Sequence, residues 1–195
     1  MDFNFKSFNE QAPHIKVFEY FLFKLYEWTK EFNSEANNDL SVLKSQKLLF
    51  FTVAASLSDE PENILATNIF KDFKAYQFGP VEETIYLHLK ENSNSLSNSV
   101  LTFSNLTLNF EESTFSSTLD SIKRYSQKDL TLFNQVDKSL SKLKDFNANL
   151  VSYSAFHLVE LSHQWKCWIN AFYNNAPKSS ITNRDISAEI MRFSF

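Results

Sequence analysis

Histidines and carboxylates are the residue types from which this chain could build a metal site. The sequence contains four histidines, and Glu160-Leu161-Ser162-His163 has the Glu-x-x-His spacing of half a di-iron site. A complete di-iron site needs a second such pair and further glutamates on facing helices, and the sequence holds no second pair. We therefore expect no metal ion and no cofactor.

Cys167 is the residue best suited to nucleophilic catalysis, because a thiolate beside a histidine is a strong nucleophile. It lies between Trp165 and Trp168, and this aromatic setting favours a buried, unreactive thiol. Ser162 and His163 are adjacent, but neighbouring residues on a helix point in different directions, so their adjacency does not predict a catalytic triad. We expect no catalytic residue and no enzymatic activity.

Glycine is scarce enough to exclude several enzyme classes. The chain has one glycine, Gly79. Phosphate-binding loops, dinucleotide fingerprints and the nucleophile elbow each require two or more glycines at fixed spacing. All three are excluded, and the shortage also disfavours a turn-rich all-β fold.

The charge pattern does not predict nucleic-acid binding. Affinity for nucleic acids comes largely from clustered Lys and Arg, whereas this chain has a net charge of -4 and its 19 basic residues are scattered. The densest basic cluster, at Lys138, Lys142 and Lys144, shares its segment with Asp137 and Asp145. That mixture is typical of a solvated helix face.

Cysteine usage and hydropathy predict a cytoplasmic protein. A single cysteine cannot form an intramolecular disulfide, and no charged start leads into an apolar run as in a signal peptide. No stretch reaches the ~18 consecutive apolar residues that a membrane span requires. We expect no association with a membrane.

Apolar periodicity predicts a mainly α protein: a single compact helical domain with a small β-hairpin element. Residues 1–13 are predicted to be an N-terminal arm and residues 14–195 the domain. Helices are expected at 14–32 and 42–57, from Gly79-Pro80 onward, from Asp129 onward, at 151–172 with a break near His163, and from the capping box at Thr182. The expected hairpin lies within 101–110, and residues 70–78 are expected to be extended.

Two blocks of the sequence resemble the Panacea domain of SocA-like antitoxins. The first block consists of Lys47-Leu48-Leu49-Phe50-Phe51, then Phe73-Lys74-Ala75-Tyr76-Gln77-Phe78-Gly79-Pro80-Val81, then Tyr86. It is similar to the family pattern Lys-Leu-Leu-Tyr-aromatic followed by Phe-x-Ala-Trp-x-Tyr-Gly-Pro-Val. The second block, Leu161-Ser162-His163, Trp168 and Ala171 followed by Ile181 to Ile186, is similar to the closing helices of that family.

The resemblance implies a helical antitoxin that neutralises a co-encoded toxin by direct binding. The implied partner is the toxin, encoded by the adjacent gene. An alternative is a proteolytic adaptor that delivers a bound client to a protease, and some members of the family are phage or prophage proteins. The resemblance marks these residues as structural or partner-binding: Lys47, Leu48, Leu49, Phe73, Ala75, Phe78, Gly79, Pro80, Val81, Tyr86, His163 and Trp168.

The same residues also have a purely structural interpretation. Gly79 permits a sharp turn, and Pro80 fixes the entry to a helix. His163 forms a hydrogen bond near a helix break, and Trp168 fills the core. The sequence leaves both interpretations open, because a motif that defines a fold need not be the binding surface.

Overall fold

The computed structural model describes residues 10–32, 39–57, 63–92, 96, 102–104, 107–109, 118–120, 122 and 127–189. Its longest helices are α2 (Pro13–Phe32), α3 (Val42–Leu57) and α6 (Leu130–Phe146). The other helical segments are η1 (Leu65–Ile69), α4 (Glu83–Glu91), η2 (Gln127–Asp129), η3 (Leu150–Ser152), α7 (Ala155–His163), α8 (Lys166–Ile169), η4 (Asn170–Asn175) and α9 (Asn183–Ser187).

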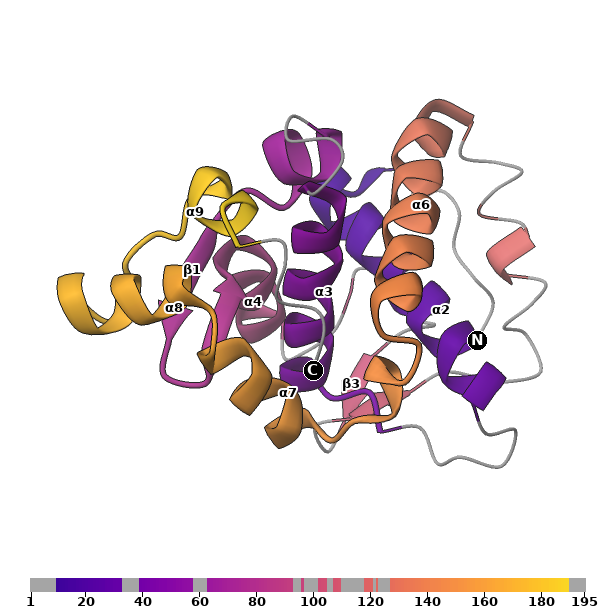
Figure 1. Ribbon diagram of the computed structural model, residues 1–195. Helices are drawn as coiled ribbons and strands as arrows, with labels where there is room; N and C mark the ends of the chain where they lie inside the picture. Colours follow the sequence, from indigo (N-terminus) through magenta and orange to yellow (C-terminus); the bar gives the residue numbers. More distant parts are fainter. Residues whose placement is uncertain are drawn as a thin grey trace.

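Helix α3 is the centre of the molecule. Every side chain from Lys44 to Leu57 is buried, as expected for a helix that is apolar over more than one face. In Figure 1, α2 and α6 lie on one side of α3, and α4, β1 and α8 lie on the other. The helix therefore joins two layers whose elements alternate along the sequence.

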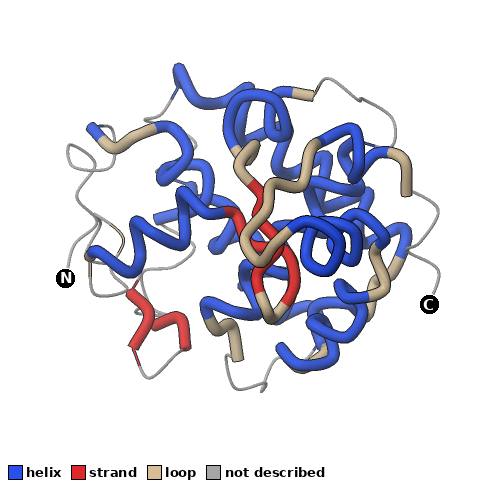
Figure 2. The backbone as a smooth tube through the Cα atoms, turned by 90° about the vertical axis from the view of Figure 1, so that its left-hand side faces the viewer, coloured by secondary structure: helices blue, strands red, loops and turns tan. Residues whose placement is uncertain are grey.

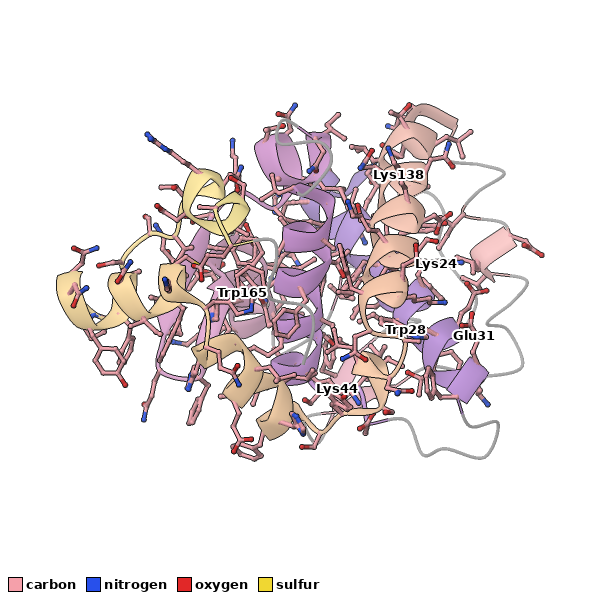
Figure 3. All side chains as sticks on the ribbon, viewed as in Figure 1. Lys24, Trp28, Glu31, Lys44, Lys138 and Trp165 are labelled. Carbon is pink, nitrogen blue, oxygen red and sulfur yellow. The ribbon has the colours of Figure 1, made fainter. Side chains whose placement is uncertain are left out.

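The layer formed by α2 and α6 is held by cross-helix polar pairs. Near the start of both helices, the Lys16 ammonium lies 2.6 Å from the Asp129 carboxylate. Near their ends, the Lys144 ammonium lies 2.8 Å from the Glu31 carboxylate. The two helices are therefore parallel, and Figure 3 shows Trp28 and Glu31 following one another along α2 where it meets α6.

Two antiparallel hairpins complete the fold: β1 (Phe73–Tyr76) with β2 (Gly79–Glu82), and β3 (Thr102–Ser104) with β4 (Thr107–Asn109). The β1–β2 hairpin lies among helices, whereas β3 and β4 form a separate pair (Figure 2). The structure thus confirms the mainly helical fold with a small hairpin expected from the sequence.

The prediction that a helix begins at Gly79-Pro80 is wrong. These residues form strand β2, and α4 begins later, at Glu83, with Glu82 as its N-cap. Pro80 faces Ala75 across the hairpin, and the backbone N–H and C=O of Ala75 are bonded on its other side, to residues 178 and 179. The missing N–H of Pro80 therefore costs no bond in the ladder.

The second half of the chain follows its predicted pattern except near residue 151, because the helix expected at 151–172 is preceded by η3, and α7 begins only at Ala155. Helix α7 ends at His163 and α8 begins at Lys166, which confirms the break near His163. The capping box at Thr182 is present, because its hydroxyl accepts the Asp185 N–H and the Asp185 carboxylate accepts the Thr182 N–H. Part of the predicted arm, residues 1–9, lies outside the described residues, and α2 begins at Pro13.

Candidate functional site at the β1–β2 hairpin

Gly79 is the point at which three separate motif segments meet. Its φ is +88°, a conformation that residues with a Cβ rarely adopt. A Cβ placed on Gly79 would lie 2.2 Å from Ser162 Oγ and 3.2 Å from Lys47 Nζ. The position therefore requires glycine twice over, for its backbone angle and for the space that Ser162 and Lys47 occupy.

Lys47 projects from α3 to the outer edge of β2. It is fully buried, and its ammonium donates a hydrogen bond to the Pro80 carbonyl oxygen. Burial lowers the pKa of Lys47 to about 7. Because no described strand pairs with β2 on this side, Lys47 satisfies a carbonyl that would otherwise be buried without a partner.

Gln46 acts in the same way one residue earlier on α3. Its side-chain oxygen accepts the Glu82 N–H at 2.9 Å, and its side-chain NH2 lies 3.5 Å from the Glu82 carbonyl oxygen. A neighbouring strand would bond to Glu82 with the same donor and acceptor pair. Gln46 and Lys47 together therefore close the edge of the hairpin from a helix.

Glu82 links the start of α4 to the residue that precedes β1. Its carboxylate accepts the Ile85 N–H at 2.8 Å and the Asp72 N–H at 3.3 Å. Burial raises the pKa of Glu82 to about 7, although these two hydrogen bonds favour the charged form. The residue is therefore an N-cap and a brace across the base of the hairpin.

His163 and Trp168 hold the hairpin turn from the side of α7 and α8. The two rings are stacked, with centroids 3.9 Å apart, and the Trp168 indole N–H donates to the Tyr76 carbonyl oxygen at 2.9 Å. Burial, and secondarily the charge of Lys47, lowers the pKa of His163, against the opposing effect of a hydrogen bond to the Gln77 backbone. The break between α7 and α8 thus fixes the position of the turn.

Most of the remaining motif residues are core residues. Phe73 packs edge-on against Phe50, and Phe50 packs against Trp165, which lies beside α3 in Figure 3. Tyr76 meets the ring of Tyr86 and donates its hydroxyl to Glu83. The other buried members are Leu48, Leu49, Ala75, Pro80 and Val81.

Phe78 differs from the other motif residues because half of its side-chain surface is exposed. It occupies the two-residue turn between β1 and β2, with an exposed fraction of 50%. Trp168, whose indole N–H bonds to Tyr76 just before this turn, stacks on the partly buried Phe172 with centroids 5.0 Å apart and meets the ring of Tyr173, which is 70% exposed. We call Phe78, Phe172 and Tyr173 the aromatic surface.

The residues considered for catalysis do not converge. His157 stacks on Tyr153 at the start of α7, whereas His163 stacks on Trp168 at the opposite end of that helix. Cys167 is buried, and burial, with the nearby Glu189 carboxylate, raises its thiol pKa. Within the described residues, no three His, Cys, Asp or Glu side chains are grouped so that they could bind a metal ion.

Sequence reasoning missed two residues of this site. Gln46 had a weak signal, as a polar residue inside a helix that is otherwise deeply apolar. Glu82 directly follows the Gly79-Pro80-Val81 motif, and its hydrogen bond to the Asp72 N–H depends on a pairing register that periodicity does not give. The structure brings together Lys47, Gly79 and Ser162 although they lie far apart in the sequence.

The class defined by this fold is a mainly helical protein whose central helix seals the edge of a small β-hairpin. Among the helices that the structure describes, none has the length and apolar character needed to cross a bilayer. The family model for the SocA-like antitoxin Panacea domain matches residues 46–169, and the chain belongs to this family. No curated protein and no solved structure matches the chain.

Proposed function

We propose that this protein is an antitoxin that neutralises a toxin by binding it directly, without catalysis. Membership of the SocA-like antitoxin family carries this proposal. The aromatic surface supports it, because exposed aromatic side chains are enriched at the centres of protein interfaces. The expected partner is the product of the adjacent gene.

Phe78 is the motif residue best placed to contact the toxin. Its neighbours in the motif are fixed from several sides: Gly79 by Ser162, Pro80 by Lys47, and Tyr76 by Trp168. These contacts hold the turn rigid while the Phe78 ring remains exposed. A rigid exposed aromatic ring loses little conformational entropy on binding, which favours a role as an anchor.

The test of the function is co-expression with the neighbouring gene. If the neighbour stops growth when expressed alone, and this chain restores growth and co-purifies with it, the proposal is supported. A neighbour that is harmless, or that does not bind this chain, would contradict it. The level of the neighbour during rescue shows whether it is held inactive or delivered to a protease.

Phe78→Ser tests the binding surface. The variant should bind the toxin at least roughly tenfold more weakly, since loss of a central aromatic anchor costs more than about 1.4 kcal/mol. Phe146→Ser is the matched control, because Phe146 is 41% exposed and lies on α6, on the other side of α3 (Figure 1). Equal affinities of the two variants, measured by calorimetry, would exclude Phe78 as an anchor.

A further inference from the structure

The β1–β2 hairpin is extended on its second side by residues 178–181. The Ala75 N–H donates to the Ser179 carbonyl at 2.9 Å, and the Ile181 N–H donates to the Phe73 carbonyl at 2.8 Å. Ser180 lies opposite Lys74 between these two bonds, at a position where facing residues exchange no backbone bonds. Its own N–H and C=O therefore point away from β1.

The two edges of this small sheet differ. The edge at β2 is closed by Gln46 and Lys47, whereas no backbone group in the described part of the chain pairs with the N–H or C=O of Ser180, which is exposed. The opening is one residue long, because the Lys178 N–H donates to Ala75 and the Thr182 N–H donates to the Asp185 carboxylate.

A surface cavity of about 330 Å³ adjoins the open edge. It lies between α8 with η4 and the region of α9, which occupy the same side of the molecule in Figure 1. The residues that line it include two with carboxylate side chains, two with amide side chains and one with an ammonium side chain. The lining residues that supply them are Asp185, Glu189, Asn170, Asn175 and Lys166, with Ser180 at the edge.

We propose that an extended segment of a partner protein pairs with Ser180 and places a Lys or Arg side chain in this cavity. This assignment of the partner rests on the proposed function, and under that function the partner is the toxin. An added strand would exchange two backbone hydrogen bonds with Ser180, and a side chain of that strand would point into the adjoining cavity. Asp185 already accepts from Thr182, and Glu189 accepts from the N–H groups of Lys166 and Cys167. Both carboxylates keep their negative charge and outnumber the single cation, so the cavity favours a basic side chain.

A short peptide tests the site independently of the toxin. The probe is acetyl-Thr-Val-Lys-Val-Thr-amide, titrated into the full chain and followed by amide NMR shifts, with a glutamate version for comparison. We expect weak binding, with Kd on the order of 1 mM, and shifts at Ser180, Asn170 and Asn175. The glutamate version should bind at least roughly tenfold more weakly. No shift at Ser180, or equal affinity for the two peptides, would overturn the proposal.

Two pairs of variants sharpen this experiment. Ser180→Pro removes the outward N–H and should abolish peptide shifts, whereas Ser180→Ala retains it, loses only the hydroxyl that accepts from Lys74 at 2.9 Å, and should bind normally. Asn175→Lys should weaken and Asn175→Asp should strengthen binding of the lysine peptide, each by roughly threefold to tenfold. Identical affinities for the Asn175 pair would contradict a basic occupant even if Ser180→Pro misfolds.

The toxin is then tested with the same variants. If it binds the wild type and Ser180→Pro equally, the strand-addition proposal is wrong and the antitoxin function stands. If the neighbouring gene product does not bind at all while the lysine peptide binds at Ser180, the antitoxin function fails and the site stands with another partner.

Discussion

We call the contact between α3 and the β1–β2 hairpin the junction. Lys47, an ionisable residue buried in the junction, differs from Glu19, which is buried in α2. Both are fully buried. Lys47 donates to the Pro80 carbonyl, so its burial satisfies another buried polar group. Neither carboxyl oxygen of Glu19 makes a well-formed hydrogen bond within the described residues, although the nearby Gln11 side chain favours its charged form. Of these two residues, Lys47 is thus buried with a partner at the hairpin, whereas the Glu19 carboxyl is buried in α2 without a well-formed hydrogen bond.

The family match separates Lys47 from Glu19. It spans residues 46–169, so it begins at Gln46 and Lys47 and leaves α2 outside. The residues that close the hairpin edge thus belong to the shared domain, and Glu19 belongs to the remainder of this chain. We expect the junction to respond to substitution more severely than α2 does.

The largest effect is expected for Gly79→Ala. The positive φ alone should cost about 1–2 kcal/mol, and the overlap of the new Cβ with Ser162 should raise the total to roughly 3 kcal/mol or more. Urea unfolding measures this loss. The double variant Gly79→Ala with Ser162→Ala should regain the steric part only, because it leaves the backbone strain. A loss below about 1 kcal/mol for Gly79→Ala would contradict the close contact seen in the structure.

The need for Gly79 could be predicted from the sequence only in part. Its type and position indicated a sharp turn, because one glycine followed by proline is a strong turn signal. The turn proved to join two strands instead of opening a helix, since β2 pairs with β1 and α4 begins at Glu83. The contact with Ser162 could not be predicted, because it depends on how α7 packs against the hairpin.

Long elements were predicted better than the site. The bounds of α3, 42–57, follow directly from its apolar run, and the break after His163 was also expected. Gln46 and Glu19 show what periodicity cannot give: both are buried polar residues on helices, yet only one of them bonds to a strand edge. That distinction comes from the tertiary register and not from local pattern.

The second effect in size is expected for Lys47→Met. At pH 9 the variant should lose roughly 1–3 kcal/mol, because the Pro80 carbonyl remains buried without its donor. The pKa of Lys47 is lowered from 10.5 to about 7 on folding, so the unfolded chain binds an extra proton between these values. Wild-type stability should therefore rise with pH in this window, by up to about 1.4 kcal/mol per unit.

The Lys47→Met variant should lack this rise in stability with pH. Urea unfolding at several pH values between 8 and 10 would then show a growing difference in the free energy of unfolding between wild type and variant. Lys47→Arg is the matched control, since it restores a donor but keeps its charge and cannot become neutral at these pH values. Parallel pH profiles of the wild type and Lys47→Met would mean that Lys47 does not change its protonation on folding.

Glu19→Gln should have the smallest effect on stability, and it should raise stability instead of lowering it. Burial raises the pKa of Glu19 from 4.5 to about 8, against a smaller opposing effect of Gln11, so unfolding releases a proton between these values. Wild-type stability should fall as pH rises through this window, and Glu82, with its pKa raised to about 7, adds to the fall. Glu19→Gln should remove only its own share and gain roughly 1–2 kcal/mol at pH 8.

Measurements at pH 5 and pH 8 separate this effect from a change in packing. A gain in stability that is the same at both pH values would mean that the amide packs better, whereas a gain confined to pH 8 would report the ionisation of Glu19. Because Glu19 lowers stability up to about pH 8 and Lys47 raises it above about pH 7, these two residues together predict a stability minimum near neutral pH. The double variant Glu19→Gln with Lys47→Met should abolish that minimum, since the rise in stability above about pH 7 would be lost.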